Sequence, residues 1–471
     1  MTINALPAEI LSEIFIHCLP EDPLSIPQPN VLIAPLSLCR VCSSWRTLAT
    51  HTPQLWQTVG VNLQYAWTQL YGSGFPRKRL DVLEAWNQRM GVLRPSIALG
   101  RQHHRVVYTK EEDVVSDHDF FKSRVLRNVR ALDLNGFPES DLKILSEVVD
   151  TFPHLTHLVL REPGGREHNL KKLRFPSTPN LTHLYIDCHF ENWPMRPVIS
   201  KMFTWTKLTH LCANLEMDPS EWRTMLRCCE SLTHALVQVR FITPIAPVTA
   251  NASNPNAHAI DSIKPLHLSL RVLVIHATLT DLDIVFQKTN FDSLEQLRLS
   301  IGGRSFLKLD SLHRMLSFTP RVKELHLRGS VSNGVDSFLD YTADVTLNTY
   351  VPELQVLVTD AAIFTTLPTV PDDLYKVLDS AWLTRGWEHL VHAPGRKRVL
   401  EIMLNLGRYI SQDLASLMRE RIAQEPHPVF DVRVRAEGDG GTDIATHTRW
   451  RQLLTADLEG DWKKLMGFYT V

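Results

Sequence analysis

A short leucine-containing motif recurs through most of this 471-residue chain and constrains its fold more than any other feature. The run LTHLVL at residues 155–160 returns as LTHLYI at 181–186, as LTHL at 208–211 and as LTH at 232–234. Looser copies, with Leu or Val at the same positions, begin at residues 129, 270, 294, 322 and 354. Successive copies begin 24 to 38 residues apart, so the motif marks a repeated structural unit rather than unrelated domains.

Each copy has the pattern of a short buried strand, and L-x-x-L-x-L is the strand signature of leucine-rich repeats. Helices are predicted between copies, at residues 141–151, 219–229, 281–288, 306–318 and 336–341. A single strand and helix cannot bury their apolar faces alone, so neighbouring units must stack. The predicted fold class is therefore α/β: a curved leucine-rich-repeat solenoid with parallel strands inside and helices outside, after a short N-terminal helical module.

The segments that flank the repeats are less regular. Strands at 55–63 and 94–99 and a helix at 79–89 predict an N-terminal cap. Strands at 398–406 and 428–435 and helices at 411–424 and 449–466 predict a C-terminal cap. Residues 243–265, with four prolines, predict an inserted loop. The expected domains are the helical module at 1–56, the cap and first irregular repeats at 57–128, the repeat array at 129–390, and the C-terminal irregular repeats and cap at 391–471.

The first fifty residues predict short amphipathic helices that need a partner. Pro7 stands at a helix start and Glu9 in its first turn, where the helix dipole favours an acid. Apolar residues then recur with helical spacing, and a second helix is predicted to begin near Pro35 after a Pro-rich gap. Short helices of this kind cannot cover their own apolar stripes.

Three runs in residues 5–56 carry a family signature: LPAEIL, VCSSW and PQLW. With them the segment resembles an F-box, in the variant common among mushroom-forming fungi, although the long Pro-rich gap departs from that pattern. The resemblance implies a three-helix unit that docks on a Skp-type adaptor and, through it, on a cullin–RING scaffold. The adaptor-binding residues that it implies are Leu6, Pro7, Ile10, Leu11, Ile14, Val41, Cys42 and Trp45. Phe15, Leu38 and Leu48 are expected to pack inside the module.

Four histidines occupy the same position of successive copies: His157, His183, His210 and His234. Strand alternation places them opposite the core leucines, on the concave face of the solenoid. We expect a solvated ladder of stacked rings, and a metal site, a site for an acidic partner and a response to pH near 6.5 are the alternatives. The residues of this face predicted to contact a target protein are His157, His183, Tyr185, His210, Gln296, Arg298, Glu324 and His326.

The motifs of catalytic and cofactor sites do not stand out in this sequence. We find no P-loop, G-x-S-x-G or H-E-x-x-H, and therefore expect no catalysis, no cofactor and no metal, with an unrecognised enzyme site in the repeats as an alternative. Cys39 and Cys42 form a lone CxxC, which we interpret as buried helix cysteines rather than a metal or redox site. The basic runs at 77–79 and 396–398 are interpreted as solvated turns rather than nuclear signals.

Charge and hydropathy narrow the class of partner. Lys and Arg total 50 against 51 Asp and Glu, a balance that argues against a nucleic-acid binder. The sequence shows neither a signal peptide nor an apolar run of about 20 residues, and its seven cysteines fit reduced thiols, so we expect a cytoplasmic and/or nuclear protein with no membrane partner. The resemblance implies the substrate-recognition subunit of a Skp–cullin–F-box ubiquitin ligase that binds a target protein; the alternative is a non-degradative leucine-rich-repeat interaction scaffold.

Overall fold

A computed structural model shows two compact units, which divide between Cys212 and Ala213. The described residues are 6–19, 29–68, 72–106, 114–137, 139–161, 175–187, 203–215, 219–239, 266–267, 269–277, 286, 289–301, 306–307, 309–328, 330–331, 350–360, 400–406 and 430–436. Within these ranges, every helix is too short or too polar to cross a membrane.

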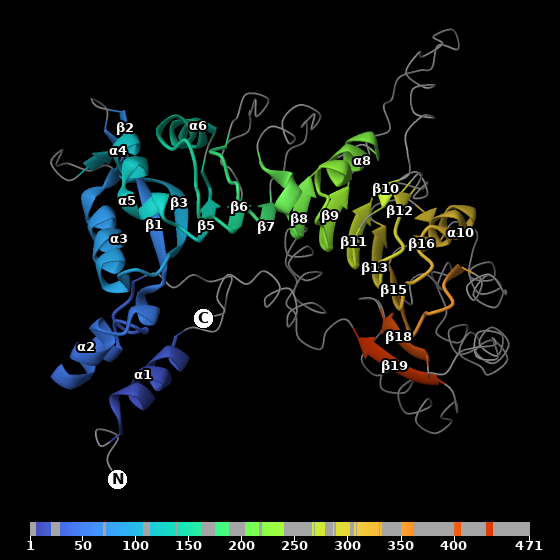
Figure 1. Ribbon diagram of the computed structural model, residues 1–471, viewed down its shortest axis with the longest axis horizontal. Helices are drawn as coiled ribbons and strands as arrows, with labels where there is room; N and C mark the ends of the chain where they lie inside the picture. The colour runs from blue at the N-terminus through green and yellow to red at the C-terminus, as the bar shows by residue number, and fades with distance from the viewer. Residues whose placement is uncertain are drawn as a thin grey trace, which may run out of the picture. The chain divides into compact units, whose positions relative to one another are not determined.

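The first unit begins with short helices that pack on one another (Figure 1). They are α1 (Ala8–His17), the 3-10 helix η2 (Leu38–Arg40), α2 (Ser43–Thr50) and the 3-10 helix η3 (Pro53–Trp56). Phe15 is fully buried, and its ring centroid lies 4.8 Å from that of Trp45. The indole nitrogen of Trp56 donates a hydrogen bond to the carbonyl oxygen of Ala49 at 2.8 Å. Aromatic packing and this buried hydrogen bond therefore join α1, α2 and η3.

The helix predicted to run on from Pro35 is interrupted at Cys42. This residue is extended, with φ −158° and ψ 174°, and its sulfur accepts a hydrogen bond from the backbone nitrogen of Trp45 at 3.4 Å. A side chain that accepts from a first-turn N–H is a helix N-cap. Cys42 therefore starts α2 instead of lying within one continuous helix.

After these helices the first unit forms a sheet with the strand order β4-β2-β1-β3-β5-β6-β7. The strands are β1 (Thr58–Thr68), β2 (Gly72–Pro76), β3 (Ser96–Val106), β4 (Val114–Ser116), β5 (Ala131–Asn135), β6 (His157–Arg161) and β7 (His183–Asp187). β2 pairs antiparallel with β1 and β4, whereas the pairs from β1 through β3, β5 and β6 to β7 are parallel. The helices of this part are α3 (Arg77–Met90), α4 (Asp117–Lys122), α5 (Arg124–Arg127) and α6 (Glu139–Val148).

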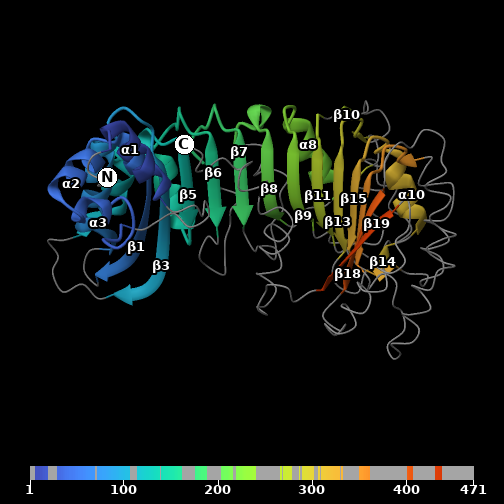
Figure 2. The ribbon, with the colours of Figure 1, turned by 90° about the horizontal axis from the view of Figure 1, so that it is seen from below.

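A further strand, β8 (His210–Leu215), follows the 3-10 helix η6 (Trp205–Lys207) and contains the division between the units. The second unit holds a parallel sheet with the strand order β9-β11-β13-β15-β17-β18-β19, and Figure 2 shows β9, β11, β13 and β15 side by side. These strands are β9 (His234–Val239), β11 (Val272–Ala277), β13 (Gln296–Ile301), β15 (Glu324–Arg328), β17 (Val356–Asp360), β18 (Leu400–Leu406) and β19 (Phe430–Ala436). Two short parallel pairs join β10 (Leu266–His267) to β12 (Thr289–Asn290) and β14 (Phe306–Leu307) to β16 (Ser330–Val331).

Corresponding positions of neighbouring copies lie opposite each other in both sheets. Leu158 pairs with Leu184 in the first unit, and Leu297 pairs with Leu325 in the second. All four leucines are completely buried. The strands predicted from the motif and the parallel sheet are thus confirmed, and within each unit these leucines are buried side by side.

The other predicted helices, strands and loops are in part found and in part outside the described residues. The predicted helices at 141–151, 219–229 and 306–318 are found as α6, α8 (Pro219–Cys228) and α10 (Leu309–Ser317), and the late strands at 398–406 and 428–435 as β18 and β19. The antiparallel strands β2 and β4 were missed by the sequence reasoning. The predicted loop at 243–265, the helices at 336–341, 411–424 and 449–466, and all of 281–288 except Phe286 lie outside the described residues.

Candidate interaction surfaces

Large apolar side chains are exposed on the N-terminal helical segment. Ile10 and Ile14 of α1 are 50% and 38% exposed, and Val41 beside α2 is 59% exposed. The residues before η2 add Val31, Leu32 and Ile33, of which Leu32 reaches 78%. We call these six side chains the apolar N-terminal surface. Ile10 and Ile14 stand four residues apart on α1, about one helical turn, and exposed apolar side chains grouped in this way are typical of a binding site.

The predicted adaptor-binding residues divide by exposure. Pro7, Ile10, Ile14 and Val41 are exposed, whereas Leu6, Cys42 and Trp45 are half-buried. The prediction for Leu11 needs correction, because this side chain is only 7% exposed and lies in the core of the segment.

Some of the residues assigned to the interior are found there. Phe15 and Leu38 are buried as expected, and Leu48 is half-buried. Sequence reasoning missed Val31, Leu32 and Ile33, because it treated the whole stretch between the helices as a Pro-rich gap. Three consecutive apolar residues inside that gap were the available signal.

Three of the four predicted histidines, His157, His183 and His210, form a stack. Ring centroids of the first two are 4.1 Å apart with planes at 14°, and those of the last two are 4.2 Å apart at 6°. The predicted stacking is therefore confirmed. It follows from the parallel register, which places His157 directly opposite His183.

Threonine hydroxyls fix the orientation of these rings. The Thr182 hydroxyl lies 3.1 Å from the carbonyl oxygen of Thr156 and 2.9 Å from Nδ1 of His183. The hydroxyl has one proton and donates it to the carbonyl oxygen of Thr156. The contact with His183 is therefore assigned as a hydrogen bond that the imidazole Nδ1–H donates to the hydroxyl oxygen of Thr182. Equivalent contacts join Thr156 to His157 at 2.8 Å and Thr209 to His210 at 2.8 Å. Each stacked ring thus directs an Nδ1–H at the hydroxyl of the threonine before it.

The expectation that the histidine ladder is solvated is wrong for its first member. His157 is only 9% exposed, and burial, with smaller effects of His183, Arg130 and His210, lowers its pKa to about 2. His183 and His210 are half-buried. Stacked rings also point their nitrogens side by side rather than toward one point, which is a poor arrangement for chelating one metal ion. Across the described part of the chain, no cluster of three or more His, Cys, Asp or Glu could hold a metal.

The predicted target-binding residues of the second unit interact with one another. Arg298 Nη2 lies 2.7 Å from Glu324 Oε1, and His326 Nε2 contacts the same oxygen. The side chains of Arg298, Glu324 and His326 are 13%, 22% and 11% exposed, and Gln296 is half-buried. Tyr185, in the first unit, lies 5.8 Å from the Arg161 guanidinium. The predicted face of β13 and β15 therefore already satisfies most of its own charge.

A polar pocket of about 350 Å³ lies at the starts of β11, β13, β15 and β17. We call it the strand-start pocket. Each of these strands is preceded by a buried residue, Leu270, Leu294, Val322 or Leu354. The residues that flank these buried positions, several of them in the turns before the strands, line the pocket. The lining residues are Ser269, Arg271, Ser293, Glu295, Arg321, Lys323 and Glu353.

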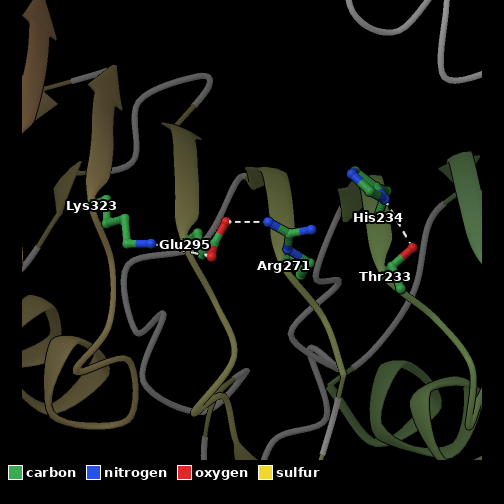
Figure 3. Close-up of polar contacts among 5 residues, drawn as sticks. All are labelled: Thr233, His234, Arg271, Glu295 and Lys323. Atoms are coloured by element: carbon green, nitrogen blue, oxygen red, sulfur yellow. Dashed lines mark hydrogen bonds and ion pairs between the residues drawn. The ribbon is translucent and has the colours of Figure 1, made fainter.

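An ion-pair row crosses this pocket, and Figure 3 shows it beside Thr233 and His234. The carboxylate of Glu295 accepts hydrogen bonds from Arg271 Nη2 at 2.7 Å and from Lys323 Nζ at 3.2 Å. The hydrogen bond from Arg271 is the main cause that lowers the pKa of Glu295. Nδ1 of His234 lies 2.9 Å from the hydroxyl oxygen of Thr233, as in the first unit. Burial lowers the pKa of His234, and Arg271 lowers it further by a smaller amount.

The comparisons with known proteins concern the helical segment. Residues 3–62 match the family model described as F-box-like. No curated protein matches the chain. The matched span contains α1, α2 and η3, and with them the whole apolar N-terminal surface. The chain therefore carries an F-box-like domain at residues 3–62.

Proposed function

We propose that this protein is the substrate-recognition subunit of a Skp–cullin–F-box ubiquitin ligase. Its F-box-like domain binds a Skp-type adaptor and, through it, the cullin–RING scaffold. The observation that carries the proposal is the apolar N-terminal surface, with Ile10, Ile14 and Val41 exposed on the matched domain. Burying a fully exposed side chain of this size contributes about 1.5–3 kcal/mol, and covering the exposed part of several such side chains contributes a corresponding fraction from each.

The remainder of the chain is proposed to bind the target protein as irregular leucine-rich repeats. Three features support this: the spacing of the copies, the parallel register of their strands, and the buried leucine that each copy contributes. In such an array each unit contacts its neighbours and the strands form the inner, concave side.

The proposed mechanism is proximity. A receptor that holds its target near a ubiquitin-charged enzyme supplies effective concentration and orientation rather than acid or base groups. We therefore propose a non-catalytic subunit that acts in the cytoplasm and/or the nucleus, where ligases of this class would meet their targets.

The test compares the intact chain with a variant that lacks adaptor binding. Proteins captured by the full-length chain are offered to a reconstituted ligase that contains either the wild type or Ile14→Asp. We expect ubiquitination of at least one captured protein with the wild type and none with the variant. A partner that binds both forms and is ubiquitinated by neither would favour the alternative, a non-degradative interaction scaffold.

A further inference from the structure

Two charged side chains of the strand-start pocket have no ion-pair partner among the residues that the structure describes. Arg321 precedes β15, Glu353 precedes β17, and both are exposed. Arg321 stands three residues before Glu324 and Glu353 three residues before Val356, and Glu324 and Val356 are paired in the sheet. Both line the same pocket, so a partner that enters it meets one available cation and one available carboxylate.

The other charges of the pocket are already engaged. Glu295 is bound on both sides, by Arg271 at 2.7 Å and by Lys323 at 3.2 Å. A ligand that approaches this row has to compete with existing ion pairs. Arg321 and Glu353 give up only water when they bind, and they are therefore the groups that select a ligand.

We propose that the strand-start pocket binds a polypeptide segment of the target in which an acidic and a basic side chain lie close together. The acid pairs with Arg321 and the base pairs with Glu353. This inference rests on the proposed function, because it names the target chemistry and moves the docking site from the predicted strand face to the strand starts.

Size and charge both favour this ligand class. A volume of about 350 Å³ is at the small end of ligand pockets and admits a pair of side chains rather than a folded domain. The hydroxyls of Ser269 and Ser293 add neutral hydrogen-bonding groups for a peptide. The lining carries both signs of charge, with Arg271, Arg321 and Lys323 against Glu295 and Glu353, and it therefore offers partners to an acidic and to a basic side chain at once.

The face of β13 and β15 that was predicted to bind the target has fewer charged groups available to a partner. Arg298 and Glu324 contact each other at 2.7 Å with side chains that are 13% and 22% exposed. A ligand would have to break this partly buried pair, and separating such charges is costly unless each finds a new partner. The exposed charges of the pocket carry no such cost.

The experiment uses the full chain with its adaptor and short fluorescent Gly/Ser peptides as probes. Each peptide carries one Asp and one Arg, in either order and at several spacings, or two Asp, or two Arg. Binding is measured by fluorescence anisotropy at low ionic strength, where exposed charges are least screened. We expect the wild type to prefer mixed-charge peptides of one order over both like-charged peptides.

Charge exchange in the pocket gives the decisive comparison. Arg321→Glu and Glu353→Arg should each weaken binding of the preferred peptide by roughly fivefold, as for one exposed ion pair. The double exchange restores binding and reverses the preferred order of Asp and Arg. Lys143→Glu, on the exposed face of α6, is the matched control and should leave binding unchanged.

Two results would overturn the inference: like-charged peptides that bind the wild type as well as mixed ones, or pocket variants that bind like the wild type. Adaptor binding is measured on the same samples. Normal adaptor binding without a mixed-charge preference overturns this inference alone, whereas a wild type that fails to bind the adaptor overturns the proposed function.

Discussion

Ile14 and Phe15 are adjacent in α1 and face opposite surroundings. Ile14 is 38% exposed, whereas Phe15 is fully buried against Trp45. We predict that Phe15→Ala lowers the free energy of unfolding by about 3–5 kcal/mol, because it opens a cavity in the core. Ile14→Asp should leave that free energy nearly unchanged and weaken adaptor binding. Urea unfolding and co-purification with the adaptor measure the two effects.

Val92→Asp is the matched control for the effect of Ile14→Asp on adaptor binding. Val92 is 98% exposed and lies outside residues 3–62, so its substitution adds the same charge away from the F-box-like domain. Adaptor binding by this variant should equal that of the wild type. Full adaptor binding by Ile14→Asp would remove this residue from the interface.

His157 should make the stability of the protein depend on pH. Burial lowers its pKa to about 2 in the folded state, against an ordinary value of 6.5. As pH falls below 6.5 the unfolded chain takes up a proton that the folded chain does not. The free energy of unfolding therefore falls by up to about 1.4 kcal/mol per pH unit, and the loss continues toward pH 2. Urea unfolding at pH 7.5 and pH 5 should show a smaller loss for His157→Gln than for the wild type.

Asp133 has the opposite effect on the pH dependence of stability, and its contribution must be the same in the proteins that are compared. Burial raises its pKa to about 6, against the opposing effect of Arg161, so its protonation favours the folded state as pH falls through 6. This contribution is common to wild type and His157→Gln and cancels in their difference. An identical pH dependence of His157→Gln and wild type would contradict the prediction.

At the scale of elements, strand starts are joined in two different ways. Before β7 and β8, a threonine hydroxyl donates to the carbonyl of the equivalent residue in the preceding copy, as Thr182 does to Thr156 at 3.1 Å. Before β11, β13 and β15, the same position holds Arg271, Glu295 and Lys323, and ion pairs join them. The first kind of link is insensitive to salt, and the second is screened by it.

The threonine link is tested by Thr182→Val, which keeps the shape of the side chain and removes its hydroxyl. The loss affects the bond to Thr156 and the contact with Nδ1 of His183. We predict a fall of about 1–3 kcal/mol in the free energy of unfolding, because partly buried polar groups lose a partner. Thr182→Ser should retain most of the stability in chemical denaturation. Equal stability of the Val variant and the wild type would show that the link contributes nothing.

The ion-pair link predicts a weaker and salt-dependent effect. Glu295 is 34% exposed in its side chain, so Glu295→Gln should cost no more than about 1 kcal/mol at low ionic strength. Wild type and variant should converge near 1 M salt, where charges are screened within about 3 Å. Denaturation midpoints at low and high NaCl measure this, and a difference that persists at high salt would assign Glu295 another role.

At the scale of the whole molecule, the sequence predicts repeated strands better than binding surfaces. Leu158 and Leu297 could be placed in the core because each copy needs one inward leucine, and both are buried. β2 and β4 pair antiparallel at the edge of the first sheet and repeat nothing, so periodicity gave no signal for them. Leu11 was misplaced because a helical stripe does not reveal which of its members a neighbouring helix covers.

The strand-start pocket was missed for a related reason. The motif is recognised by its leucine, whereas the lining residues flank that position, as Arg321 and Lys323 flank Val322. The ion pairs among Arg271, Glu295 and Lys323 depend on which residue stands opposite in the neighbouring copy, and that requires the register.

The parallel register determines what kind of epitope a partner of the second unit can bind. Arg321 and Glu353 line the same pocket but stand 32 residues apart in the chain, because the segments before neighbouring strands contribute side chains to one row. A partner bound along such a row recognises an epitope that no short stretch of this chain contains. Linear peptides cut from residues 269–355 should therefore fail to compete with the intact protein, and antibodies that block the row should recognise only its folded form.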